Sequence, residues 1–144
     1  LFKAAQHNTS VILPSDCIVG NPDELEVGGV VCKVTEVPED KQILDIGPET
    51  KARIGNILAK AKTIVWNGPV GYFENIHYRQ GTDFMYYTIT ENTEATSIVG
   101  GGDTLTAISK KEYLDKITHI STGGGAMLEY IEKGTLPGIE ALKK

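Results

Sequence analysis

The stretch ATSIVGGGDTLTAI, residues 95–108, decides the fold because it reads as a short buried strand, a glycine turn and a helix in succession. Ser97–Val99 is short and rich in β-branched residues, as strands buried on both faces are. The same order recurs in KTIVWNGPVGYFE (62–74) and THISTGGGAMLEYI (118–131), and more weakly in QILDIGPETKARIGNILAKA (42–61). Alternation of strands and helices predicts an α/β fold, with an open parallel sheet that carries helices on both faces.

The glycine turns of these units are expected to share one edge of the sheet. Right-handed crossovers bring the carboxyl ends of parallel strands to the same edge, and open α/β sheets bind their ligands there. Two regions lie outside this pattern. Residues 11–37 predict a β-hairpin or edge strands. Residues 82–92 are expected to form a crossover helix, although Thr88, Ile89 and Thr90 are poor helix formers.

Composition narrows the class of protein. A chain of 144 residues is long enough for one core, but it opens at Leu1 on what reads as the end of a helix, so we interpret 1–144 as a single, partial domain. The net charge of −5 argues against a nucleic-acid partner. No apolar run approaches the ~20 residues of a membrane helix, and no secretory signal is visible, so we expect a cytoplasmic protein. Cys17 and Cys32 match no metal or redox spacing, and we interpret them as two reduced thiols.

The turn GGGDT, residues 100–104, is suited to hold a phosphate without a lysine. Glycine lets the backbone approach a ligand, and the N-terminus of the following helix offers unpaired N–H groups to an anion. Asp103 is then a ligand for Mg²⁺ that bridges to phosphate oxygens, or alternatively only the N-cap of that helix. The turn lacks the Gly-Lys-Ser/Thr of a P-loop, and Leu105 replaces the last glycine of a dinucleotide-binding fingerprint.

Two further turns favour a polyphosphate or a phosphoryl group in transit. STGGGA (121–126) repeats the glycine-rich helix start, although tight helix–strand packing alone also needs small residues. In WNGPVGYFE (66–74), Asn67 is suited to hydrogen-bond a phosphate or the turn itself. Pro69 offers a rigid apolar surface to a sugar or base, and Glu74 can accept hydrogen bonds from ribose. The alternative is an Asn-Gly-Pro turn with an exposed glutamate.

Three long motifs in order and spacing resemble the C-terminal part of the phosphoglycerate kinase family, in its bacterial form. They are KTIVWNGPVGYFE, SIVGGGDTLTAI and HISTGGGAMLEYIEKGTLPGIEAL, and PSDCIVG and QILDIGPET also fit, so that the resemblance covers essentially the whole chain. It implies a Rossmann-like nucleotide-binding domain of a cytosolic glycolytic enzyme that is monomeric at full length. The implied reaction is ATP + 3-phosphoglycerate = ADP + 1,3-bisphosphoglycerate, with Mg²⁺.

The resemblance also implies roles for individual residues. The nucleotide would be held by Asn67, Pro69, Glu74, Gly101, Gly102, Asp103 and Thr104, with Asp103 on Mg²⁺. The catalytic residues, which would stabilise the transferring phosphoryl group, are Gly102, Gly124 and Gly125. The family's Gly-Gly-Ala-Lys segment and its N-terminal domain, which binds 3-phosphoglycerate, are expected upstream of Leu1. We therefore expect no turnover by these 144 residues alone, and the alternative is a non-catalytic nucleotide-binding fragment.

Overall fold

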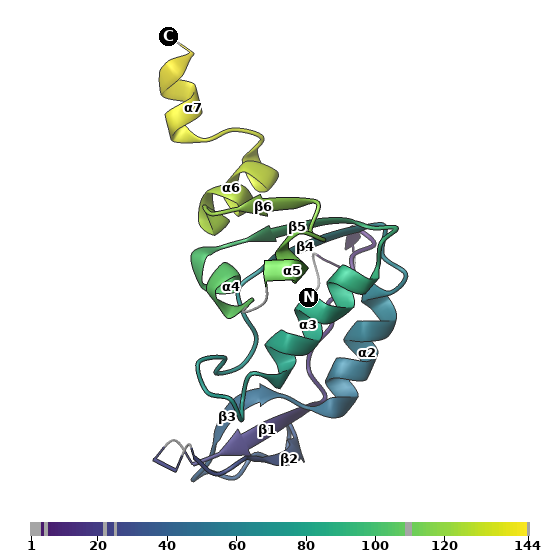
Figure 1. The fold of residues 1–144 in the computed structure, drawn as a ribbon, viewed down its shortest axis with the longest axis vertical. Coiled ribbons are helices and arrows are strands. Elements are labelled where there is room, and N and C mark those ends of the chain that lie inside the picture. The colour runs from purple at the N-terminus through teal and green to yellow at the C-terminus, as the bar shows by residue number, and fades with distance from the viewer. Residues whose placement is uncertain (1–3, 5, 22, 25, 109–110, 144) are drawn as a thin grey trace.

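Two three-stranded sheets organise the chain in the computed structural model, which describes all residues except 1–3, 5, 22, 25, 109–110 and 144 (Figure 1). One sheet is antiparallel, with the strand order β2-β1-β3, and the other is parallel, with the order β4-β5-β6. The strands are β1 (Asp16–Gly20), β2 (Val30–Lys33), β3 (Gln42–Ile46), β4 (Thr63–Asn67), β5 (Thr96–Gly100) and β6 (His119–Ser121).

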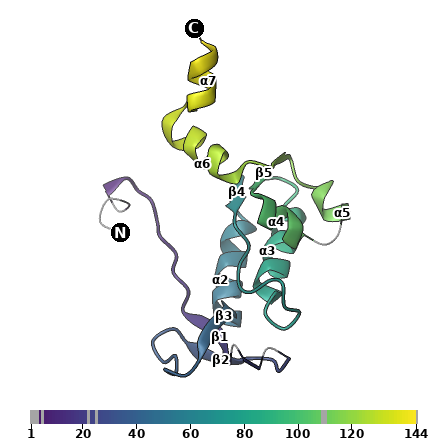
Figure 2. The same cartoon turned by 90° about the vertical axis from the view of Figure 1, so that its left-hand side faces the viewer.

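Helices lie on both faces of the parallel sheet, as the sequence predicts. Figure 1 shows α2 to α5 on one side of this sheet and α6 on the other, and Figure 2 shows α7 standing away from the rest of the molecule. No helix in the described part of the chain has the length and apolar character needed to cross a membrane. The helices are α2 (Pro48–Leu58), α3 (Gln80–Glu91), α4 (Gly102–Ala107), α5 (Lys111–Leu114), α6 (Gly124–Lys133) and α7 (Pro137–Leu142).

The antiparallel sheet confirms one expectation and corrects another. β1 and β2 form the hairpin predicted within residues 11–37, with Cys17 opposite Cys32. β3, however, pairs antiparallel with β1. The turn at Gly47, between β3 and α2, therefore belongs to this sheet, and the prediction that all the glycine turns share one edge is wrong for it. The physical reason is that the backbone of β3 is hydrogen-bonded to β1 of the hairpin and not to a strand of the parallel sheet.

The main core lies between the parallel sheet and α3. Ile64 and Trp66 of β4 point to the same face as Val99 of β5, and they pack against Tyr86 and Ile89 of α3. All five side chains are buried. This burial explains why residues 82–92 form the predicted helix in spite of their β-branched composition, because tertiary packing outweighs weak intrinsic propensity.

The start of α2 is capped by a carboxylate from the antiparallel sheet. Asp16 of β1 is buried, and its two oxygens accept the N–H groups of Thr50 at 2.7 Å and Glu49 at 2.9 Å. The Thr50 hydroxyl donates to the same carboxylate at 2.6 Å. Burial disfavours the charged form of Asp16, but these hydrogen bonds outweigh it and hold its pKa below the ordinary value.

The start of α3 is capped in the same manner by the next aspartate of this sheet. Asp45 of β3 is buried, and it accepts the N–H of Gly81 at 2.8 Å and that of Ile46 at 2.8 Å. Burial raises the pKa of Asp45, although both N–H groups favour the carboxylate. Both long helices between the two sheets therefore begin at a carboxylate supplied from a distant strand, which satisfies N–H groups that a helix start leaves unpaired.

We expect Asp16→Asn to lower the free energy of unfolding at pH 7 by about 1–3 kcal/mol, because a neutral amide replaces a charged acceptor of three donors. The folded-state pKa lies below the ordinary value of 3.8. The contribution of Asp16 is therefore present above the unfolded-state pKa and is lost as the pH falls through the folded-state pKa. Urea unfolding of both proteins at pH 7 and below about pH 4 measures the difference.

The matched control is Asp40→Asn, since the Asp40 side chain is 76% exposed and forms a long ion pair with its neighbour Lys41 at 3.7 Å. This variant is expected to change the free energy of unfolding little at either pH. A difference between wild type and Asp16→Asn that stays constant as the pH falls below 4 would contradict the capping role.

Candidate functional site

The carboxyl ends of the three parallel strands lie side by side. Asn67, the last residue of β4, is paired in register with Gly100 at the end of β5. Gly100 is paired in turn with Ser121 at the end of β6. The three motifs that the sequence singles out therefore meet at one edge of the parallel sheet, as predicted for these strands.

The turns after these strands are in direct contact. A Cβ at Gly124 would overlap Oδ1 of Asn67 and would lie 2.8 Å from both Cα and N of Gly101. The N–H of Gly101 donates to the carbonyl of Ser121 at 3.1 Å, which joins the second turn to the third strand. Gly101 also has φ +98°, a backbone conformation that favours glycine. Asn67, Gly101 and Gly124 thus form a close contact. Any side chain larger than the hydrogen of glycine at position 124 would push Asn67 and Gly101 away.

Two helix N-termini start at this contact. α4 begins after Gly101 and α6 after Gly123, and each N-cap residue is a glycine, which has no side chain to accept the first N–H groups of its helix. The first backbone N–H groups of each helix have no carbonyl in a preceding turn to bind, so they remain available as donors. Gly102 and Gly125 are exposed, and a Cβ at either would meet nothing within 4 Å, so the backbone there is open to a ligand. Such a pair of helix starts is suited to bind an anion with several oxygens.

Asp103 is the second residue of α4 and is exposed. The N-cap position belongs to Gly101, with no side-chain hydrogen bond, so the alternative that Asp103 is the N-cap is wrong. Among the residues that the structure describes, no group of three or more His, Cys, Asp or Glu side chains is placed to hold a metal. A cation at Asp103 would therefore need oxygen ligands from a bound molecule and from water, as Mg²⁺ in nucleotide sites commonly has.

The side chain of Thr104 does not face the open start of α4, although Thr104 follows Asp103 directly in the sequence. Its side chain is fully buried, and Oγ1 accepts the N–H of Gly68 at 2.8 Å. The hydroxyl thus faces the loop that follows β4, and only the backbone N–H of Thr104 belongs to the open helix start. Asn67 is exposed at this loop and Pro69 is half-buried in it. The sequence contained no local signal for this contact, because the two residues lie 36 positions apart.

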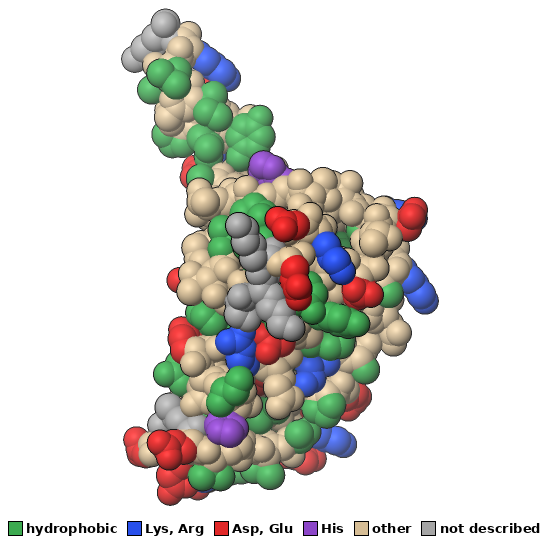
Figure 3. All heavy atoms as spheres, in the orientation of Figure 1, with side chains coloured by type: hydrophobic (Ala, Val, Ile, Leu, Met, Phe, Trp, Pro, Cys, Tyr) green, Lys and Arg blue, Asp and Glu red, His purple; other side chains and the backbone are tan. Residues whose placement is uncertain are grey.

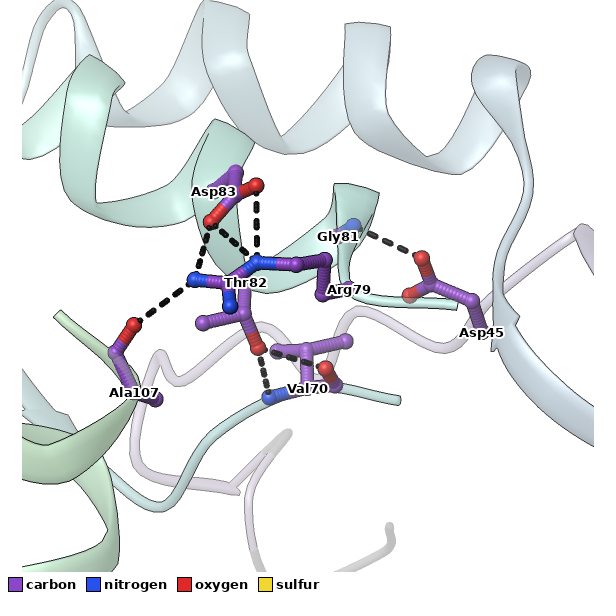
Figure 4. A network of polar contacts seen from close by, with 7 residues as sticks. All are labelled: Asp45, Val70, Arg79, Gly81, Thr82, Asp83 and Ala107. Carbon is purple, nitrogen blue, oxygen red and sulfur yellow. Dashed lines mark hydrogen bonds and ion pairs between the residues drawn. The ribbon is translucent and has the colours of Figure 1, made fainter. Parts of the chain in front are cut away.

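A second threonine fixes the other end of the same loop. Oγ1 of Thr82, in the first turn of α3, accepts the N–H of Val70 at 2.8 Å and donates to the carbonyl of Val70 (Figure 4). The indole N–H of Trp66 binds the carbonyl of Gly68 at 2.7 Å. The loop from Asn67 to Val70 is consequently held by side chains from three elements, and none of these three contacts was predicted.

The start of α3 is in turn joined to α4. Arg79 forms a two-pronged ion pair with Asp83, with its Nη2 atom 2.9 Å from Oδ1, and the same nitrogen donates to the carbonyl of Ala107 at 3.0 Å. The hydrogen bond to Asp83 raises the pKa of Arg79. Figure 4 shows these residues beside Thr82 and Asp45, so that one polar network joins the start of α3, the loop after β4 and the end of α4.

Glu74 lies apart from this edge in the contacts that the structure records. It is exposed and lines a shallow hollow of about 510 Å³ with Glu26, Asn75, Ile76 and His77. The glycine turns are not among the residues that line this hollow. Glu74 therefore follows the same connection as Asn67 and Pro69, but the structure does not bring it into contact with the two helix starts.

On the face drawn in Figure 3, the charged side chains do not form a basic cluster that would indicate an anion site. Lysine and arginine are scattered there, and acidic side chains gather over the connection between β1 and β2 at the lower end. This distribution agrees with the net charge of −5. Backbone N–H groups, and not a cluster of cations on this face, are the donors that the edge offers to an anion.

Comparison with known proteins identifies the family of this arrangement. The family model described as phosphoglycerate kinase matches residues 1–134. The chain belongs to the phosphoglycerate kinase family. The phosphoglycerate kinase of Haemophilus influenzae (strain ATCC 51907) is 44% identical over 142 residues, which are 99% of this chain and 36% of the relative. That of Blochmanniella floridana is 43% identical over 152 residues, covering 100% of this chain and 38% of the relative.

Solved phosphoglycerate kinase structures share the fold. The chain resembles the phosphoglycerate kinase of Coxiella burnetii with a TM-score of 0.86 and 42% identity over 96% of this chain and 36% of that one. The enzyme from Pyrococcus horikoshii OT3 gives a TM-score of 0.77 and 32% identity over 99% of this chain and 36% of that one. The chain thus spans little more than a third of the length of these phosphoglycerate kinases.

We expect Gly124→Ala to destabilise the fold by about 1–3 kcal/mol, because its methyl group must displace Asn67 or Gly101. The matched control is Gly125→Ala, where the new methyl group meets nothing within 4 Å. Urea unfolding of the two variants and the wild type compares them at neighbouring positions of one helix. Equal stability of both variants would show that the contact at Gly124 does not hold the edge together.

Proposed function

We propose that this chain is the Mg-nucleotide-binding part of a phosphoglycerate kinase, which transfers a phosphoryl group between ATP and 3-phosphoglycerate. One observation carries the proposal: two uncapped helix N-termini meet at the contact of Asn67, Gly101 and Gly124. The backbone N–H groups at the two helix starts are suited to bind phosphate groups. The family to which the chain belongs uses a substrate with such groups.

In this proposal the nucleotide's phosphates bind at the start of α4. The N–H groups of Gly102 and Thr104 are the candidate donors. The N–H of Gly101 binds the carbonyl of Ser121, so Gly101 contributes the shape of the turn instead. Asp103 is the candidate ligand of Mg²⁺, together with phosphate oxygens and water, and the exposed carboxylate beside open amides fits that ion. Bound Mg²⁺ neutralises part of the negative charge of the phosphates.

The start of α6 is the candidate catalytic element. Gly124 and Gly125 bring backbone N–H groups to the same edge, where Gly124 contacts Gly101 just before α4, and their helix has ten residues. Preorganised amides stabilise charge that develops on the oxygens of a phosphoryl group in transit, at no cost of reorganisation during the reaction. Buried Gly124 fixes the position of these amides, and exposed Gly125 leaves room for the group that passes.

The remaining nucleotide contacts are assigned to the connection after β4. Asn67 and Pro69 lie in the loop held by Thr82, Thr104 and Trp66, and we assign them to the wall of the nucleotide pocket. Glu74 is assigned to the ribose hydroxyls. Glu74 lines a hollow apart from the glycine turns. The ribose of a nucleotide is likewise separated from its terminal phosphates by the phosphate chain, so this assignment does not need Glu74 to touch the helix starts.

The whole reaction needs a site for the second substrate. We propose that 3-phosphoglycerate binds outside these residues, in the N-terminal domain of the family, and that the complete enzyme is a cytoplasmic monomer. Loss of proximity between two substrates accounts for about 7–11 kcal/mol of a barrier. The proposal therefore assigns nucleotide binding, without turnover, to the 144 residues described by the sequence.

We expect Asp103→Asn to weaken Mg·ADP binding about tenfold or more and to leave metal-free ADP binding unchanged, because only the metal ligand is lost. Isothermal titration calorimetry with ADP, in the presence of Mg²⁺ and again with a chelator, measures both affinities. Asp115→Asn is the control, since Asp115 is also an exposed aspartate but lies before β6, away from the carboxyl edge. Equal loss with and without Mg²⁺ would refute the metal role.

We expect the purified chain to bind ADP and to show no turnover in an assay that couples phosphoglycerate-dependent ATP consumption to NADH oxidation. A full-length phosphoglycerate kinase in the same assay is the positive control. A rate near that of the control would overturn the division of substrates proposed here. Absence of ADP binding in the calorimeter would overturn the nucleotide site itself.

A further inference from the structure

The β1–β2 hairpin holds the two cysteines of the chain side by side. Cys17 and Cys32 are opposite each other in the antiparallel register, and their Sγ atoms are 3.7 Å apart. Both are free thiols. Residues opposite each other in such a ladder have Cα atoms about 4.5–5.5 Å apart. Disulfides bridge Cα atoms about 4.4–6.8 Å apart, so the backbone already has the spacing of a disulfide.

The two thiols differ in their access to solvent. Cys17 lies in the central strand of the sheet and is 1% exposed. Cys32 is half-buried in β2, which is an edge strand with the exposed neighbours Val30 and Val31. A reagent from solution therefore reaches Cys32 first, and reaches Cys17 through it.

The electrostatics of the pair support the same order of reaction. Burial and the neighbouring Cys32 raise the pKa of Cys17 to about 11. Cys17 therefore remains a thiol at neutral pH and is a poor first nucleophile, because the thiolate is the reactive form. In the mixed disulfide Cys32 no longer has a thiol that can hydrogen-bond or ionise beside Cys17, so the contribution of Cys32 to this raised pKa disappears.

We infer that Cys17 and Cys32 form a redox modification site, which a low-molecular-weight disulfide oxidises to an intramolecular disulfide. The Cys32 thiolate attacks one sulfur of the reagent, forms a mixed disulfide and releases one thiol, to which the proton of Cys32 passes. Sγ of Cys17 then attacks Sγ of Cys32, and the second half of the reagent leaves as a thiol with the proton of Cys17. Two protein thiols are oxidised and one reagent disulfide is reduced to two thiols.

This site is separate from the candidate nucleotide edge. The cysteines belong to the antiparallel sheet, and the glycine turns belong to the parallel one. The disulfide would join the edge strand β2 covalently to β1, the strand whose Asp16 caps α2. Oxidation is therefore expected to fix the hairpin without touching the residues assigned to phosphate.

The test uses the full chain and oxidised glutathione. After incubation at neutral pH and an acid quench, thiols are alkylated under denaturing conditions and the protein is mapped by mass spectrometry. We expect loss of both alkylation sites, a monomer lighter by two hydrogen atoms, and one cross-linked peptide pair that contains Cys17 and Cys32 and separates on treatment with dithiothreitol. This result on the wild type needs no variant to fold.

Two serine variants test the order of reaction. Cys17→Ser is expected to stop as a stable mixed disulfide at Cys32, heavier by one glutathione. Cys32→Ser is expected to leave Cys17 unmodified in the folded chain. A wild type that accumulates only the mixed disulfide at Cys32, or that forms disulfide-linked dimers, would overturn the inference. Faster modification of Cys17 in Cys32→Ser than of Cys32 in Cys17→Ser would overturn the proposed sequence of steps.

Discussion

The contact of Asn67, Gly101 and Gly124 is the constraint on which the candidate site depends. Parallel register brings the three strand ends to one line, and the absence of a Cβ at Gly124 lets the turns touch. Within α6, all of which the structure describes, Gly124 is the single buried residue. The start of α6 is thus held by close contacts with the turn after β5, Gly124 on Gly101 and Met127 on Gly100, and not by a large apolar interface.

The antiparallel sheet acts on the same edge from a distance. Its carboxylates at Asp16 and Asp45 cap α2 and α3, and the start of α3 carries the Thr82 hydroxyl that holds Val70. The antiparallel sheet therefore positions the loop that follows β4, beside the carboxyl edge of the parallel sheet. This arrangement explains how a helix as rich in β-branched residues as α3 begins at a defined residue: its first turn is fixed from outside the helix.

The sequence predicts the parallel sheet and the meeting of its turns well, because strand, turn and helix follow each other within short windows and crossovers have one hand. It does not predict the partner of β3, since QILDI has the same local composition in a parallel or an antiparallel sheet. The caps made by Asp16 and Asp45 join residues more than 30 positions apart, and periodicity carries no information at that range. For the same reason the sequence spacing of Cys17 and Cys32 did not predict that the two thiols are neighbours, since only the register of the hairpin places them opposite each other.

The hydroxyl of Thr104 has a thermodynamic consequence for any ligand of this edge. It belongs to the first turn of α4, yet it accepts the N–H of Gly68 in the loop after β4. This hydrogen bond joins the glycine turn proposed to hold phosphate to the loop proposed as the wall of the pocket. Conformational entropy of the loop is then lost when the chain folds and not when the ligand arrives. A ligand that binds at this edge therefore does not have to order the loop, and its binding free energy does not include that entropy loss. The loop is in this sense preorganised.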